Sequence, residues 1–216
     1  MLTRLHITLL LILAVAVWAA TLVVLGIPLS WDYLKPFTIA VAVLTTICIV
    51  FDKWLWSLSV FKGWLVQRPN LNGTWKATLA SDWKDPQTGQ SIPPIECVMV
   101  ITQTFSKMTT RLFTPESNSF LYANRLVCQD DGVFQLYGIY LNTPKVELRG
   151  QRSEIHYGAL ILEVRGDPPT SLAGHYWTDR GTKGSLELSN RQWRRVASFN
   201  EGAMIFGLSA APSGHS

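Results

Sequence analysis

A long N-terminal stretch without charge constrains this chain more than any other feature. No acidic or basic residue lies between Arg4 and Asp32, and Leu5–Leu25 is an apolar run interrupted only by one His and two Thr. At about 1.5 Å per residue, a helix of this length spans about 31 Å, which matches the hydrocarbon core of a bilayer. The sequence therefore predicts a membrane-spanning helix over about residues 5–25.

A second charge-free run extends from Pro36 to Phe51. As a helix it covers only about 24 Å, so it needs its flanks, from about residue 34 to 54, to cross. Trp and Tyr residues flank this run, as they do at membrane–water interfaces. We therefore expect residues 1–66 to form a transmembrane helical hairpin. The alternative, a cleaved signal peptide, is disfavoured because signal-peptide cores have only about 7–15 apolar residues and because a second apolar run follows.

The cations around the hairpin predict its orientation. Arg4 precedes the first run, and Lys53, Lys62 and Arg68 follow the second, whereas the connecting segment 26–35 holds one cation and one anion. More positive charge at both outer ends favours cytoplasmic termini. Three cysteines without paired spacing agree with a reducing compartment. We expect both termini and everything after residue 66 to lie in the cytoplasm.

The sequence pattern changes from Leu71 onward to alternation between apolar and polar residues, with turn residues between short segments. The pattern predicts eight strands: Gly73–Ser81, Ile95–Phe105, Lys107–Thr114, Ser119–Gln129, Val133–Asn142, Glu154–Val164, Leu172–Thr178 and Gly184–Ser189. Short strands joined by tight turns are typical of an up-and-down antiparallel barrel of the lipocalin-like kind, which holds its own side chains or one small ligand. We expect this all-β barrel over residues 67–196 and a flexible tail over residues 197–216.

Alternation assigns inward faces to the later strands. If the leucines of the sixth, seventh and eighth strands point inward, then His156, Tyr176 and Thr178 also do. The barrel is thus predicted to be apolar at one end and polar near these three residues. Trp75, in the Gly73-Thr74-Trp75 opening of the first strand, is predicted to plug one end and to have a structural role.

The segment from His175 to Gly184 is the densest polar and aromatic stretch of the chain. Aromatic rings stack on bases, Arg and Lys pair with phosphates, and glycines let backbone N–H groups approach an anion. The alternative is a hairpin whose cations are merely solvated. The candidate ligand-binding residues from this segment and from cations elsewhere are Tyr176, Thr178, Arg180, Thr182, Lys183, His156, Arg149, Arg152 and Arg111.

Motifs for catalysis and metal binding are not found. The sequence contains no nucleophile elbow, Walker loop, HExxH or paired-carboxylate motif. Its three Cys and four His do not show metal-ligand spacing. We therefore expect no catalytic residues, no metal and no cofactor.

The order of these features resembles a bacterial anti-phage family. Two predicted spans, then Leu71-Asn72-Gly73-Thr74-Trp75, Arg149-Gly150, His156-Tyr157-Gly158 and the segment 174–180, are similar to the SMODS-associating two-transmembrane, β-strand-rich effectors of cyclic-oligonucleotide-based anti-phage signalling (CBASS). The resemblance covers nearly the whole chain, to about Asn190.

The resemblance implies a receptor in the bacterial inner membrane. In that family a cytoplasmic barrel binds a cyclic dinucleotide made by a partner nucleotidyltransferase, which promotes self-association into oligomers. The membrane segments then disrupt the lipid bilayer and the infected cell dies. Binding of DNA or RNA is not expected.

Two other classes of protein remain open from the residues alone. A membrane-anchored, lipocalin-like carrier of an apolar ligand is favoured by the Gly-x-Trp opening and disfavoured by the polar, cationic end. A structural domain with a filled barrel is the third possibility.

Overall fold

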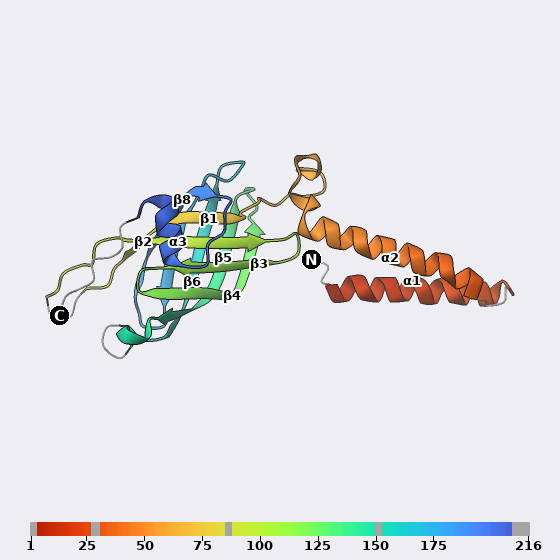
Figure 1. Cartoon of the computed structure of the whole chain (residues 1–216), viewed down its shortest axis with the longest axis horizontal. Helices are drawn as coiled ribbons and strands as arrows, with labels where there is room; N and C mark the ends of the chain where they lie inside the picture. Colours follow the sequence, from red (N-terminus) through yellow and green to blue (C-terminus); the bar gives the residue numbers. More distant parts are fainter. Residues whose placement is uncertain (1–3, 27–30, 85–87, 150–152, 209–216) are drawn as a thin grey trace. The chain divides into compact units, whose positions relative to one another are not determined.

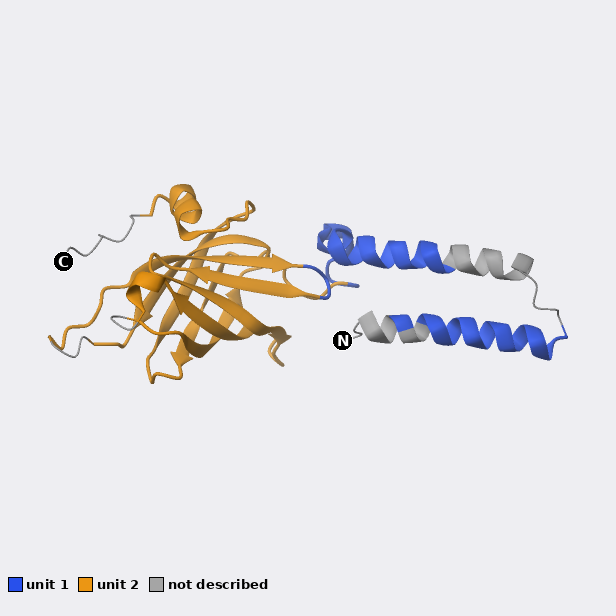
Figure 2. Cartoon of the chain, turned by 60° about the horizontal axis from the view of Figure 1, so that its bottom comes forward, with its two compact units in different colours: residues 1–65, 104–106 blue, residues 66–103, 107–216 orange. Residues whose placement is uncertain are grey.

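The computed structural model describes residues 4–26, 31–84, 88–149 and 153–208 (Figure 1). The chain divides into two compact units (Figure 2). The first comprises residues 1–65 and 104–106, and the second comprises residues 66–103 and 107–216.

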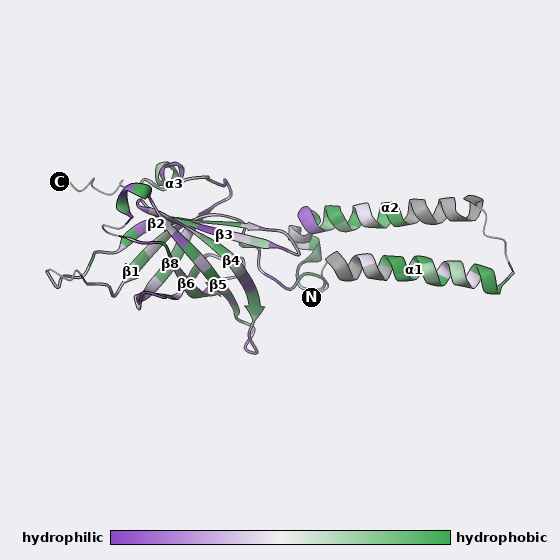
Figure 3. Ribbon diagram, turned by 90° about the horizontal axis from the view of Figure 1, so that it is seen from below, coloured by the Kyte–Doolittle hydropathy of each residue, from purple (hydrophilic) through white to green (hydrophobic). Residues whose placement is uncertain are grey.

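The first unit is helical. It contains α1 (Arg4–Val24), α2 (Trp31–Lys53) and two short 3-10 turns, η1 (Leu55–Ser57) and η2 (Ser59–Phe61). The described turns of α1 and α2 consist mainly of hydrophobic residues (Figure 3). Two threonines within them bond their own helix, since Thr21 Oγ1 donates to Val17 O at 2.8 Å and Thr46 Oγ1 donates to Ala42 O at 2.8 Å. Both predicted helical segments are therefore confirmed as helices.

The predicted membrane crossing of these helices is a separate matter. Over the residues that the structure describes, none of the helices combines the length and the apolar character that a membrane span requires. The transmembrane role of residues 5–25 and 34–54 is not supported by this finding.

The second unit is a closed antiparallel barrel. Its strands are β1 (Gly73–Ser81), β2 (Ile95–Gln103), β3 (Met108–Phe113), β4 (Ser117–Cys128), β5 (Phe134–Pro144), β6 (His156–Arg165), β7 (Ser171–Thr178) and β8 (Lys183–Gln192). Each strand pairs with the next, and β8 pairs with β1. The predicted eight-stranded, up-and-down topology is confirmed.

Strand β8 is longer than its local pattern predicts. It continues beyond Ser189 to Gln192, which pairs with Thr74 of β1. This pairing joins the two ends of the domain sequence, so the alternation within β8 could not reveal it.

Side chains from all eight strands fill the barrel. Leu160, Leu162, Leu172, Leu186 and Leu188 all point inward and are at most 2% exposed, as their alternation predicts. Burying this much apolar surface is the main favourable term for the fold.

Trp75 is completely buried within this core. Its Nε1 donates to Leu71 O at 3.0 Å, and the Arg191 guanidinium lies 5.2 Å from the centre of its ring. The predicted structural role of Trp75 is confirmed.

The expectation of a flexible tail from residue 197 needs correction. Helix α3 (Phe199–Phe206) forms there, and Ser198 caps it by accepting a hydrogen bond from the Glu201 N–H at 3.3 Å. The Ser198-x-x-Glu201 spacing is a capping-box signature that a reading based on composition overlooked. Residues 209–216 lie outside the described part of the chain.

Helix α3 is held by apolar contacts with the outside of the barrel. Phe199 packs in one cluster with Val98 and Val100 of β2 and Phe113 of β3. Gly202 lies so close to Val98 that a Cβ at this position would meet its methyl groups. This burial orders the segment and covers the outer face of β2.

Replacing Trp75 by Ala should lower the free energy of unfolding of the full chain in detergent by about 3–5 kcal/mol, because it leaves a large cavity in the core. Denaturant titration followed by circular dichroism measures the change. The matched control is Trp193→Ala, since Trp193 is 64% exposed and its loss should cost no more than about 1 kcal/mol. Equal effects of the two substitutions would contradict the structural role of Trp75.

Candidate ligand-binding site

Polar side chains gather inside one end of the barrel. Ser119, Asn142, His156 and Thr178 point inward from β4, β5, β6 and β7 and are only 4%, 8%, 9% and 9% exposed. Ser119 pairs with Asn142 across β4 and β5, and Asn142 pairs with His156 across β5 and β6. We call these four residues, together with the neighbouring Tyr140 and Tyr176, the polar mouth.

Two glycines make room for the tyrosines of the polar mouth. Tyr140 pairs with Gly158, and its phenol occupies the space that a Cβ at Gly158 would need. Tyr176 pairs with Gly184, where a Cβ would come within 2.9 Å of the Tyr176 ring. Glycine at position 158 therefore leaves room for the Tyr140 ring, and glycine at position 184 leaves room for both the Ala80 carbonyl and the Tyr176 ring.

Both phenols are protonated at physiological pH, and burial strengthens this preference. Burial raises the pKa of Tyr140 and of Tyr176 above that of a free tyrosine. Tyr176 also makes a side-chain hydrogen bond with Ser81 at the end of β1. Each phenol thus offers a neutral hydrogen-bonding group within the polar mouth at physiological pH.

His156 is neutral at pH 7. Burial, reinforced by the positive charge of Arg180, lowers the pKa of its imidazole, while the Glu154 carbonyl and Asp179 act in the opposite direction. Nδ1 lies 3.0 Å from Glu154 O. Because a carbonyl oxygen only accepts, Nδ1 carries the proton of the neutral ring and Nε2 is left as an acceptor.

Asn142 carries a buried acceptor. Its Nδ2 donates to Ser117 Oγ and to Ser119 Oγ, each at 2.9 Å. Within the described part of the chain, its Oδ1 is buried and has no hydrogen-bond partner. Native proteins contain few such atoms, so this oxygen is a natural point of contact for a ligand donor.

The β7–β8 connection brings a cation to the polar mouth. Thr178 and Thr182 close this hairpin through a 2.7 Å contact between their hydroxyls. Asp179 joins it to β6, since its Oδ2 accepts from the Tyr157 N–H at 3.1 Å. Arg180 is exposed at the tip, and its charge acts on the buried groups of Tyr140 and His156.

Five of the predicted ligand-binding residues come together here. His156, Tyr176 and Thr178 lie inside the barrel, as their strand faces predict, and Arg180 and Thr182 lie on the adjoining hairpin.

Of the other four predicted residues, two lie on the outer face of the barrel, one lies at the end of β5 that carries Asn142, and one is not described. Lys183 is exposed on the outer face of β8, where it pairs with Trp177. Arg111 is exposed on the outer face of β3, 5.5 Å from the Phe120 ring centre. Arg149 is exposed after η3 (Val146–Leu148), and its Nε donates to Pro144 O at 3.1 Å. Arg152 lies outside the described residues.

Reasoning from the sequence missed three members of the polar mouth, namely Ser119, Tyr140 and Asn142. For the two on β5 a signal was present, since Leu136, Gly138, Tyr140 and Asn142 alternate along the strand and are all buried. A face assignment anchored on Leu136 would have placed both residues inside the barrel.

Two hollows of about 220 Å³ each lie on the outer face of the barrel, and Arg111 and Phe113 line both of them. They are smaller than the roughly 300–1,000 Å³ of typical small-molecule pockets. Among the described residues, no group of three His, Cys, Asp or Glu side chains is placed to hold a metal ion.

The polar mouth and almost the whole barrel lie within the part of the chain that a family model matches. The family model described as Cap15, cyclic dinucleotide receptor domain, matches residues 66–190, which is more than half of the chain. The chain belongs to this family. The match extends from just before β1 into β8 and contains every residue of the polar mouth. No curated protein matches the sequence closely enough to indicate a relative.

Protonation of His156 should make stability depend on pH. Its pKa is lowered in the folded state, so its contribution is present above the unfolded pKa of about 6.5 and is lost as pH falls below that value. Urea unfolding between pH 5 and 8 should show this loss, and His156→Gln should remove it. The control His175→Gln keeps His156 and should keep the slope. If the His156→Gln variant unfolds with the same pH dependence as the parent, His156 is not the group that causes it.

Proposed function

We propose that this chain is a membrane-associated receptor and effector of anti-phage signalling that is activated by a cyclic dinucleotide. Membership of a cyclic dinucleotide receptor family is the observation that carries this proposal. The nucleotide comes from a partner nucleotidyltransferase, and its binding promotes oligomerisation of the chain. The oligomer disrupts the bacterial inner membrane.

The polar mouth is the proposed ligand site. A cyclic dinucleotide offers two phosphates, two bases with N–H donors, and sugar oxygens. Arg180 supplies a charge-assisted contact to phosphate, and Asn142 Oδ1 accepts from a base N–H. Tyr140, Tyr176 and His156 provide neutral donors, acceptors and ring surface. Since leucines fill the core below, the ligand lies on the polar mouth and its rim.

The proposed role requires no catalytic step. The buried tyrosines and His156 stay neutral, and the Thr178 hydroxyl is engaged with Thr182. These groups hold and orient a ligand. A receptor family is consistent with a chain that is not an enzyme.

The exposed apolar side chains of the two helices favour a lipid bilayer as a partner. Among the described side chains of α1 and α2, the large apolar ones that are half exposed or more are Ile12, Leu13, Val17, Val23, Val24, Val43, Leu44, Ile47 and Ile49. In water such exposure is unfavourable, whereas in a bilayer these side chains meet an apolar solvent. We propose that the helices insert as a hairpin with both termini and the barrel in the cytoplasm.

Because the barrel is closed, we expect copies of the chain to associate through side chains and not through strand pairing. Every one of its eight strands is paired on both sides, so a second copy cannot add a strand to an open edge. Two helices enclose no lumen, so several copies must gather before a membrane opens. A ligand drives this assembly only if it binds the assembled form more tightly than the monomer.

A carrier of an apolar ligand is the second candidate. It is less favoured because the side chains of the described strands occupy the barrel interior, where such a ligand would be held. The hollows of about 220 Å³ lie outside the barrel.

Arg180→Ala should weaken binding of the preferred cyclic dinucleotide about ten- to a hundredfold, because it removes a charge-assisted hydrogen bond. Tyr176→Phe should weaken it less, since only a hydroxyl is lost. Isothermal titration of the full chain in detergent, over a panel of cyclic dinucleotides with different bases, measures both effects.

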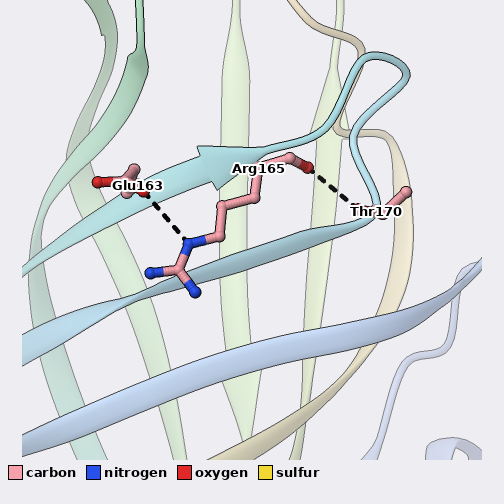
Figure 4. Close-up of polar contacts among 3 residues, drawn as sticks. All are labelled: Glu163, Arg165 and Thr170. Atoms are coloured by element: carbon pink, nitrogen blue, oxygen red, sulfur yellow. Dashed lines mark hydrogen bonds and ion pairs between the residues drawn. The ribbon is translucent and has the colours of Figure 1, made fainter.

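The matched control for this experiment is Arg165→Ala. Arg165 is a similarly exposed cation at the opposite end of β6 from His156, where its Nε lies 3.2 Å from Glu163 Oε1 and its carbonyl accepts from Thr170 (Figure 4). This substitution should leave the affinity unchanged. Unchanged binding by Arg180→Ala and Tyr176→Phe would place the site elsewhere, and stabilisation by fatty acids alone would favour the carrier.

The proposed topology predicts on which side of the membrane each segment lies. A reporter fused after Val66 should report the cytoplasm, and one inserted at Pro28, between the helices, should report the periplasm. Paired alkaline phosphatase and fluorescent protein fusions measure this in cells. A periplasmic signal after Val66 would refute the proposed orientation.

A further inference from the structure

The segment that follows α2 exposes an unusual amount of apolar surface. Trp54, Val60 and Trp64 are 62%, 65% and 70% exposed, and Leu58 and Leu65 are about half exposed. Only Trp56 within this stretch is buried as deeply as 2% exposure. Soluble surfaces rarely cluster large apolar side chains in this way.

Several backbone N–H groups of this segment bond to carbonyls within it. Leu58 N–H donates to Leu55 O at 3.0 Å, Lys62 N–H to Ser59 O at 3.1 Å, and Leu65 N–H to Phe61 O at 3.2 Å. An N–H group that is already bonded loses little when its surroundings become less polar.

The Trp64 indole is likewise satisfied, because its Nε1 donates to Val60 O at 2.7 Å. Its exposed ring can therefore enter a less polar layer without breaking a hydrogen bond to water. Trp is the side chain most typical of the membrane–water interface.

Aromatic contacts hold the segment against the end of α2. Phe51 packs edge-on against Phe61, with ring centres 5.3 Å apart, and also against Phe105 at 5.3 Å. Asp52 fixes the same turn, since its Oδ1 accepts from the Ser106 N–H at 2.8 Å and its carbonyl accepts from the Phe105 N–H at 2.9 Å. The exposed side chains thus belong to a segment that is packed in a defined position against the end of α2.

The charged side chains of residues 53–65 are all positive. No acidic residue occurs between Asp52 and Asp82. Lys53 and Lys62 are both exposed within or next to the apolar segment, and the Lys53 Nζ lies 5.6 Å from the Trp54 ring centre. Exposed Trp, aliphatic side chains and lysines are complementary to an anionic lipid headgroup layer.

We propose that residues 53–65 form an interfacial surface that binds the headgroup layer of an anionic phospholipid bilayer. Trp54, Leu58, Val60 and Trp64 enter the layer between headgroups and acyl chains, while Lys53 and Lys62 contact lipid phosphates. This inference rests on the proposed membrane association and goes beyond it, because it assigns a lipid class and a contact surface outside the helices.

Spin labels at Leu58→Cys and Val60→Cys test the proposal in the full chain, reconstituted in vesicles of phosphatidylcholine alone or mixed equally with phosphatidylglycerol. Cys48 and Cys128 are replaced by Ser. Cys97 stays, because it is fully buried and burial raises the pKa of its thiol to about 12, which protects it from labelling. Ser185→Cys, at an exposed position of β8, is the aqueous control.

Labels at positions 58 and 60 should be more accessible to oxygen than to an aqueous nickel complex in the anionic vesicles, whereas the label at 185 should show the reverse. Lys53→Gln combined with Lys62→Gln should abolish the preference for anionic vesicles, with vesicle affinity about fivefold weaker for each lysine lost. The proposal would be overturned if the labels at 58 and 60 were as accessible to water as the label at 185. It would also be overturned if the chain failed to bind anionic vesicles.

A label at Val43→Cys, on the exposed side of α2, separates this proposal from the membrane-spanning hairpin. Lipid exposure at 58 and 60 with water exposure at 43 would support the interfacial surface and reject the hairpin. Lipid exposure at 43 with water exposure at 58 and 60 would reject the interfacial surface and retain the hairpin.

Discussion

Pairing of β1 with β8 is the interaction on which the rest of the receptor domain depends. It runs from Thr74–Gln192 to Ser81–Gly184 and closes the sheet. A closed barrel of eight strands has an interior just wide enough for its own side chains. Closure therefore forces the leucines of β6, β7 and β8 and the indole of Trp75 into one apolar core. The residues of the polar mouth lie at one end of this core.

The polar mouth follows from this restriction. The rings of Tyr140 and Tyr176 contact Gly158 and Gly184, where a side chain would collide with them. Burial raises the pKa of both phenols and lowers the pKa of the His156 imidazole, so it favours the neutral form of all three. Charge is supplied from outside the core by Arg180 on the β7–β8 connection. This separation of a neutral, hydrogen-bonding interior from a cationic rim suits a ligand with polar bases and anionic phosphates.

The helical unit follows a different physical principle from the barrel. The barrel hides its apolar side chains, whereas α1, α2 and residues 54–65 leave many of theirs exposed. Their hydrogen bonds are internal, as the Thr21, Thr46 and Trp64 contacts illustrate. An element with satisfied polar groups and unburied apolar ones is suited to a partner that is itself apolar.

Local sequence patterns determined much of this protein. Period-two alternation predicted the eight strands and the inward positions of His156, Tyr176 and Thr178, because the side chains of a strand point to alternate faces whatever surrounds them. The two apolar runs predicted α1 and α2 as helices. The Ser198-x-x-Glu201 capping signal of α3 is also local, although the small and polar composition of the tail by itself predicts no helix there.

Only the tertiary structure decided which polar residues meet. Arg180 and Lys183 are three positions apart, yet one lies beside the buried polar groups and the other on the outer face with Trp177. Asn142 and Ser119 join His156 only through the registers of β4, β5 and β6. Register and closure arise from contacts between distant segments, so the sequence alone determined which face each strand presents, and the packing of the whole barrel determined which faces come together.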